Sequence, residues 1–138
     1  GSTAHKKEGD KKTPKGTFKI GPLFIRKDRN TEPRTKLKII KINKNMGWCN
    51  DGNHQQYNKL IEINKNIKCE KLFRRDYKYD FLVPIKYNTS KPKKNKGSAI
   101  FLHLTKDYKK TLGCIALKKK DFLILIKLID KKTKIKII

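Results

Sequence analysis

Hydrophobic and polar positions alternate over several short stretches of the chain, which is the pattern of β-strands with one buried face. The clearest case is the range 79–87, where Phe81, Val83 and Ile85 fall on one face. Pro84 lies inside this range and cannot donate a hydrogen bond to a neighbouring strand, so we expect an edge strand or a bulge there. Further strands are expected at 18–20, 36–42, 98–104, 113–117 and 133–138.

The range 119–130 has the periodicity of a helix. Its apolar residues recur at spacings of three and four, which places Phe122, Leu125, Ile126 and Ile129 on one face. The remaining segments (1–16, most of 21–34, 43–56 and 88–97) are rich in Gly, Pro, Asn or charge and are expected to form loops. A loop as long as 43–56 is usually functional in a small domain. Short strands with one C-terminal helix predict a mainly β chain.

A length of 138 residues suits a single domain spanning 1–138. The longest apolar run is Phe122–Ile126, far short of the roughly 18 residues that a membrane helix needs. Gly1 and Ser2 are interpreted as a cloning remnant, so the start of the chain says little about an export signal.

The chain carries 37 Lys and Arg against 12 Asp and Glu, a net charge of +25. One explanation is a polyanionic partner, such as nucleic acid, anionic lipid or an acidic wall polymer. The other is the composition of an AT-rich genome, because Ile and Asn are abundant as well. The lysines are spread along the chain and no basic–aromatic nucleic-acid motif is present, so composition is the favoured explanation.

Three cysteines is an odd number, so at least one is unpaired within a monomer. Cys49 and Cys69 would be able to form a disulfide in an exported protein, although nothing in their spacing requires it. His54 together with these two cysteines matches no standard zinc-ligand spacing, so no metal is expected.

Cys114 and His103 are the candidate catalytic pair. A cysteine is nucleophilic as the thiolate, and an imidazole with a pKa near neutrality can take its proton. Gly113 precedes the cysteine and permits a sharp turn, so that nearby backbone N–H groups can face a developing oxyanion. The alternative for Cys114 is a buried structural cysteine. In a strand, His103 would point away from Leu102 and Leu104.

Taken with the segment 9–18, the stretches 101–104 and 111–117 resemble the catalytic domain of YkuD-type L,D-transpeptidases, cysteine enzymes that cross-link bacterial peptidoglycan. A small-domain subgroup is similar over most of the chain, from about His5 to the C-terminus. Several blocks in the same order make this resemblance more specific than one short motif. The matching blocks are 5–10, Gly47-Trp48-Cys49-Asn50-Asp51, Tyr57-Asn58, Leu72–Asp80 and 97–103.

The resemblance implies a compact β-sandwich or barrel-like fold with a small helix, and a site that needs no cofactor. It implies that the Cys114 thiolate attacks the L-centre carbonyl of the diamino acid in a tetrapeptide stem. His103, oriented by a backbone carbonyl, would activate the thiol and protonate the departing D-Ala. The nucleophile loop of Thr111, Leu112 and Gly113 would supply the oxyanion hole. Transfer to an amine of another stem gives a 3→3 cross-link.

The chain departs from the family's commonest pattern at two positions. Leu112 replaces a second histidine, and Ala116 stands where an arginine is frequent. The substrate carboxylate must then be held elsewhere, and Arg74 and Arg75 are the candidates because Arg binds carboxylates in a bidentate manner. The further substrate-binding candidates are Tyr79, Trp48 and Asp51. For Trp48 the core is the better assignment, and Asp51 would either bind the free amine of the diamino acid or cap a turn.

Two alternatives stay open. The same acyl-enzyme with water as acceptor makes an L,D-carboxypeptidase, and a basic nucleic-acid-binding module is the alternative from another functional class. The expected partner is the peptidoglycan stem peptide and not nucleic acid, and the chain is expected to be monomeric. The expected location is the periplasm or cell envelope, with a cytoplasmic recycling role as the alternative.

Overall fold

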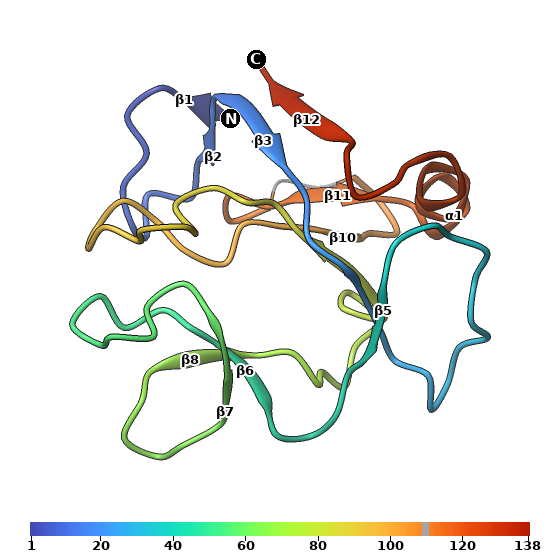
Figure 1. Ribbon diagram of the computed structural model, residues 1–138, viewed down its shortest axis with the longest axis horizontal. Coiled ribbons are helices and arrows are strands. Elements are labelled where there is room, and N and C mark those ends of the chain that lie inside the picture. Colours follow the sequence, from blue (N-terminus) through green and yellow to red (C-terminus); the bar gives the residue numbers. More distant parts are fainter. Residues whose placement is uncertain (109–110) are drawn as a thin grey trace.

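The computed structural model describes residues 1–108 and 111–138, and a five-stranded sheet lies at its centre (Figure 1). The strand order is β11-β10-β9-β4-β5. The outer pairs β4·β5 and β10·β11 are parallel, while β9 is antiparallel to both of its neighbours. The strands are Leu23–Ile25 (β4), Ile39–Lys41 (β5), Phe81–Pro84 (β9), Phe101–Leu104 (β10) and Ile115–Leu117 (β11).

Strand β10 divides its side chains between two apolar clusters, because successive residues of a strand point to opposite faces. Leu102 and Leu104 pack with Phe122 and Ile126, the two buried residues of the helix α1 (Lys119–Leu128). Phe101 joins Trp48, Tyr79 and Leu82 in the second cluster on the other face. The helix therefore covers one face of the sheet, and the His103 side chain lies on the opposite face.

A three-stranded antiparallel sheet, in the order β7-β6-β8, lies on the side of the central sheet opposite β3 and β12 (Figure 1). Its middle strand passes beside β8 so closely that a Cβ on Gly47 would lie 2.8 Å from the Cys69 sulfur. Cys49 and Cys69 are cross-strand partners, and all three cysteines are free. The strands are Met46–Cys49 (β6), Leu60–Glu62 (β7) and Cys69–Lys71 (β8).

Two small sheets bring the ends of the chain together. One joins β3 to β12 in antiparallel fashion, and the other joins β1 to β2 in parallel. The Ser2 hydroxyl donates a hydrogen bond of 2.8 Å to the carbonyl of Ile138, and the two termini lie close together in Figure 1. The strands are Ser2–Thr3 (β1), Thr13–Pro14 (β2), Gly16–Lys19 (β3) and Lys134–Ile137 (β12).

The mainly β class with one C-terminal helix is confirmed. The helix begins at Lys119 as expected and ends at Leu128, with Asp121 in its first turn and Lys127 in its last. The barrel-like form is not seen, because the strands of residues 1–108 and 111–138 form several separate sheets and no closed barrel. No helix in these ranges combines the length and apolarity that a membrane crossing requires.

The segment 21–34 is mostly loop as expected, and it contains the short strand β4, whose three residues are all buried between β9 and β5. Two other local expectations were wrong. The expected loop 43–56 contains β6. Pro84 does not mark an edge or a bulge: β9 is an inner strand, and Pro84 is its last residue, beyond the positions that pair with β4. The missing N–H of Pro84 is tolerated because no residue of β4 pairs with Pro84.

The packing of α1 on the sheet predicts that alanine substitutions at two positions of this helix differ strongly in their effect on stability. Phe122 is completely buried against Phe81, whereas Ile124 is 51% exposed. Phe122→Ala should lower the free energy of unfolding by about 3–5 kcal/mol, because it removes a buried ring and leaves a cavity. Ile124→Ala is the matched control and should change it by less than about 1 kcal/mol. Urea unfolding followed by circular dichroism measures both, and equal losses would contradict this account of the packing.

Candidate active site

The register of β10 and β11 brings His103 and Cys114 to one face. His103 is the parallel partner of Ala116, and Cys114 stands two residues earlier, directly before β11. Alternate residues share a side of the sheet, so Cys114 lies on the His103 side. Both line a pocket of about 570 Å³. Its other lining residues are Glu70, Arg74, Tyr77, Lys78, Tyr79, Ala99, Leu104, Thr105, Asp107, Thr111, Leu112 and Ala116.

The Cys114 thiol is held by two backbone groups of the neighbouring segment. It donates to the Ala99 carbonyl at 3.3 Å and accepts from the Phe101 N–H at 3.4 Å. The residue as a whole is partly exposed, but these contacts turn its sulfur inward. Burial raises the pKa of the Cys114 thiol to about 12, against the smaller opposing effect of the Phe101 N–H. The resting thiol is therefore protonated.

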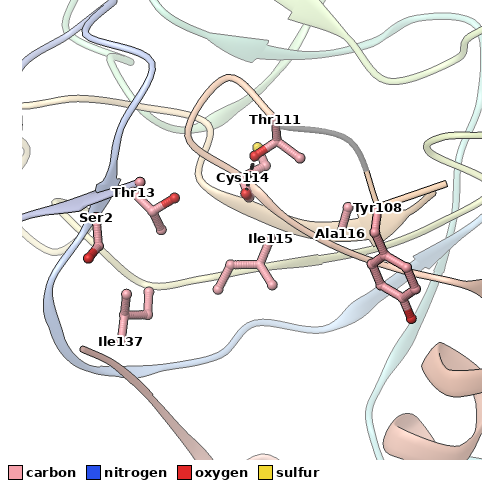
Figure 2. A pocket seen from close by; sticks show the side chains of 9 residues that line it. Ser2, Thr13, Tyr108, Thr111, Cys114, Ile115, Ala116 and Ile137 are labelled. Atoms are coloured by element: carbon pink, nitrogen blue, oxygen red, sulfur yellow. Dashed lines mark hydrogen bonds between the residues drawn. The ribbon is translucent and has the colours of Figure 1, made fainter.

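The loop before Cys114 has a conformation that requires glycine. Gly113 has a φ of +104°, and a Cβ there would lie 2.8 Å from the carbonyl oxygen of Lys12. The Thr111 hydroxyl donates to the Cys114 carbonyl (Figure 2), and Leu112 is 77% exposed. Among the described residues, no acceptor is hydrogen-bonded to the backbone N–H of Leu112, Gly113 or Cys114.

His103 has a defined tautomer. It is buried, and its Nδ1 lies 2.9 Å from the Leu104 carbonyl, which can only accept, so Nδ1 carries the proton. Nε2 is then the basic nitrogen. The ring meets Tyr79 edge-on, with centroids 5.4 Å apart. Burial lowers the pKa of His103 below its ordinary value of 6.5, so the ring is neutral at neutral pH. Within the described residues no hydrogen bond joins it to Cys114.

Glu70, Tyr79 and Arg74 form another part of the pocket wall. The Tyr79 hydroxyl donates to Glu70 Oε1, and burial raises the pKa of Glu70 above its usual range. The Arg74 guanidinium lies 5.1 Å from the centre of the Tyr79 ring and makes two hydrogen bonds with Asp76, at 2.6 and 2.9 Å. The structure thus places Arg74 and Tyr79 with the catalytic candidates and adds Glu70. The sequence missed Glu70 because a glutamate in the polar stretch Lys68-Cys69-Glu70-Lys71 has the pattern of a solvated surface segment.

The other three substrate-binding candidates do not line this pocket. Arg75 is exposed and borders a different hollow, next to Phe73. Trp48 lies in the second apolar cluster, and its indole N–H donates to Asn58 Oδ1 at 2.8 Å. Asp51 caps a turn by accepting from the Asn53 N–H at 3.0 Å. Trp48 and Asp51 therefore take the structural roles that the sequence left open.

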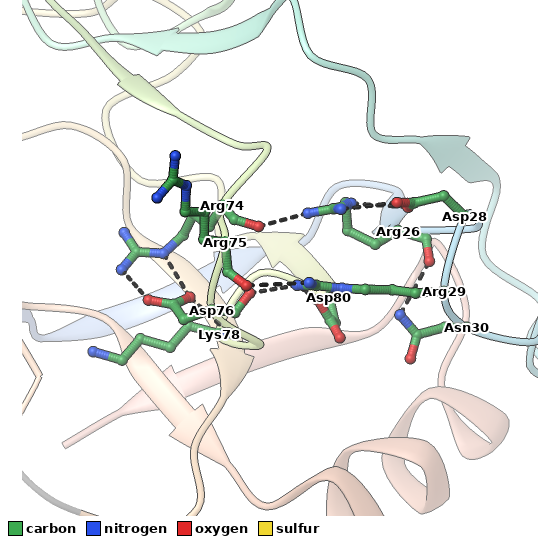
Figure 3. A network of polar contacts seen from close by, with 9 residues as sticks. All are labelled: Arg26, Asp28, Arg29, Asn30, Arg74, Arg75, Asp76, Lys78 and Asp80. Atoms are coloured by element: carbon green, nitrogen blue, oxygen red, sulfur yellow. Dashed lines mark hydrogen bonds and ion pairs between the residues drawn. The ribbon is translucent and has the colours of Figure 1, made fainter.

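A network of arginines fixes the segment 74–80 (Figure 3). Arg26 donates to the Arg74 carbonyl at 2.6 Å, while the same guanidinium pairs with Asp28 at 2.8 and 2.9 Å. Arg29 pairs with Asp80 and donates to the Arg75 carbonyl at 3.2 Å. Arg26 and Arg29 do not line the pocket. They bind backbone carbonyls of the segment 74–80 and thereby position Arg74 and Tyr79.

No metal site accompanies this arrangement in the described part of the chain. Across residues 1–108 and 111–138, no three His, Cys, Asp or Glu side chains come close enough together to hold an ion. The chemistry available in the pocket is that of a thiol, a neutral imidazole and the carboxyl groups of Glu70 and Asp107, beside backbone N–H groups that have no acceptor among the described residues.

The geometry of Gly113 predicts the effect of adding one methyl group. Gly113→Ala combines a positive φ with a clash against backbone, and should lower the free energy of unfolding by about 2–4 kcal/mol. Gly9 is the matched control: its φ is +76°, but a Cβ there meets nothing within 4 Å. Gly9→Ala should cost only the conformational part, about 1 kcal/mol. Urea unfolding of the two variants measures the difference, and equal costs would show that the contact with Lys12 is relieved freely.

Comparison with known proteins identifies the family of the chain. Residues 1–137 match the family model described as YkuD, the L,D-transpeptidase catalytic domain. No curated protein and no solved structure gave a match to the chain. Because the family match covers nearly the whole chain, this protein belongs to the YkuD family of L,D-transpeptidase catalytic domains.

Proposed function

We propose that this protein is a peptidoglycan L,D-transpeptidase with Cys114 as nucleophile and His103 as general base and acid. The observation that carries the proposal is the single pocket that holds a thiol and a neutral imidazole, beside a turn whose backbone N–H groups have no partner among the described residues. Membership of a family of cysteine enzymes that act on stem peptides supports the same assignment.

The first half-reaction makes a thioester. The thiol leaves the Ala99 carbonyl, gives its proton to His103 Nε2, and attacks the L-centre carbonyl of the diamino acid in a tetrapeptide stem. The N–H groups of Leu112, Gly113 and Cys114 hold the oxyanion, which the turn at Gly113 makes possible. As the tetrahedral intermediate collapses, the imidazolium returns the proton to the departing amine of D-Ala.

The second half-reaction releases the acyl group. An amine of another stem gives up a proton to His103 and attacks the thioester, which forms the 3→3 amide and regenerates the thiol. If water attacks instead, the product is a tripeptide and the enzyme is an L,D-carboxypeptidase. The choice depends on how well the acceptor excludes water from the pocket. We place the reaction in the periplasm or cell envelope, where the stem peptides are, and expect a monomer with one catalytic domain over 1–138.

Product analysis tests the proposal. Incubation with a disaccharide-tetrapeptide should give a cross-linked dimer and free D-Ala, which mass spectrometry distinguishes from tripeptide alone. Cys114→Ala should lower the rate of D-Ala release by a factor of about a thousand or more, and His103→Ala should lower it by about 10²–10⁴-fold. Cys69→Ala is the control and should keep full activity. Tripeptide without dimer would establish hydrolysis, and turnover by Cys114→Ala would overturn the proposal.

The lowered pKa of His103 predicts where activity is lost in acid. The imidazole accepts a proton only when it is neutral, so kcat/KM should hold as pH falls to about 6.5 and decline only below it, once His103 becomes charged. The measurement is the initial rate of D-Ala release between pH 4.5 and 8. An acid limb centred above pH 6.5 would contradict the neutral, buried imidazole.

A further inference from the structure

The carboxyl group of Glu70 is the feature of the pocket that the reaction described above leaves unused. Glu70 lies in β8, faces the same pocket as His103 and Cys114, and is partly buried. The one side-chain hydrogen bond of Glu70 within the described residues is the one that Tyr79 donates to Oε1. The other carboxylate oxygen, Oε2, is not among the buried side-chain atoms that lack a hydrogen bond, so we infer that it is accessible to solvent.

Glu70 forms no salt bridge with the described residues, although the chain has 37 Lys and Arg. Arg74 and Lys78 line the same pocket, and the charge of Arg74 partly opposes the effect of burial on the pKa of Glu70, but the Arg74 guanidinium is already held by both carboxylate oxygens of Asp76. A partly buried carboxylate with no cation bonded to it is costly, and the cost is reduced when a ligand brings one. The pairing of Arg74 with Asp76 also makes Arg74 a weaker site for a substrate carboxylate.

The same charge affects the nucleophile candidate. The negative charge of Glu70 is one of the causes that raise the pKa of Cys114, after burial. A ligand cation placed on Glu70 would offset that field and favour formation of the thiolate. The charge of Glu70 therefore disfavours the Cys114 thiolate while the pocket is empty, and this effect is removed once a ligand cation binds to Glu70.

We propose that Glu70 is a specificity-determining residue that binds the side-chain ammonium of the diamino acid in the donor stem, with Tyr79 as the positioning residue that orients its carboxylate. This inference rests on the proposed function, because it assigns a role within the same pocket. A donor whose ammonium is masked should then bind more weakly, whatever acceptor follows.

Binding to an inactive protein separates this role from catalysis. Two tetrapeptide stems are used, identical except that the side-chain amine of the third residue is free in one and acetylated in the other. With Cys114→Ala, isothermal titration should give a Kd roughly 10- to 100-fold lower for the free amine, the range of a hydrogen bond to a charged group. Adding Glu70→Gln should remove most of that preference and leave the Kd of the acetylated stem nearly unchanged.

Two further variants control the result. Gln at position 70 keeps an acceptor for the Tyr79 hydroxyl, and its melting temperature should match that of the parent. Glu62→Gln makes the same change at an exposed position of β7 and should keep the full preference. Equal affinity of the parent for both stems, no binding of either stem, or equal weakening of both by Glu70→Gln would overturn the inference.

The two proposals fail in different ways. If the wild-type protein releases no D-Ala from either stem but Glu70 still confers the preference for the free amine, the proposed function fails and the ammonium site stands. If D-Ala is released with the same kcat/KM from both stems, the proposed function stands and the role of Glu70 is wrong.

Discussion

The hydrogen bond between the Cys114 thiol and the Ala99 carbonyl is the contact on which the geometry of the site depends. Ala99 has a φ of +53°, a backbone conformation that residues with a side chain adopt only when their surroundings enforce it. Here Asn58 enforces it. Its Oδ1 accepts from the Ala99 N–H at 3.0 Å and from the Trp48 indole, and its Nδ2 donates to the Tyr87 and Asn88 carbonyls.

This network explains why blocks far apart in the sequence occur together. Glu8 accepts from the hydroxyls of both Tyr57 and Ser98 at 2.6 Å, so the N-terminal block and the segment 97–101 are fixed to each other. The N-terminal block and the Tyr57-Asn58 block therefore act behind the nucleophile candidate, where they set the backbone that holds its sulfur, while the block Leu72–Asp80 contributes to the pocket wall. Trp48 belongs to this network through its hydrogen bond to Asn58, whereas Asp51 caps the turn at Asn53, and neither lines the pocket.

Sequence reasoning succeeded where the pattern was long: the helix has ten residues with a clear period. The sequence also singled out His103 and Cys114, which the structure brings to one pocket, while their catalytic roles stay a prediction. Sequence reasoning failed for β4 and β6, because strands of three or four residues next to Pro, Asn and Gly leave too short a pattern to detect. Glu70 was out of reach for another reason: only the pairing of β8 with β6 and the hydroxyl of Tyr79 bring it to the pocket.

The resting pair is uncharged, and this shapes how the proposed reaction must start. Burial raises the pKa of the Cys114 thiol to about 12 and lowers the pKa of the His103 imidazole, so transfer of a proton from the thiol to the imidazole is strongly uphill. Burial causes both shifts, so a thiolate–imidazolium pair is disfavoured while the pocket is empty. In the proposed reaction the charge has to form together with the bond to the substrate carbonyl, when the N–H groups near Gly113, which have no acceptor among the described residues, would hold the oxyanion. A thiol kept neutral in this way is also protected from oxidation until a substrate arrives, since the thiolate is the reactive form.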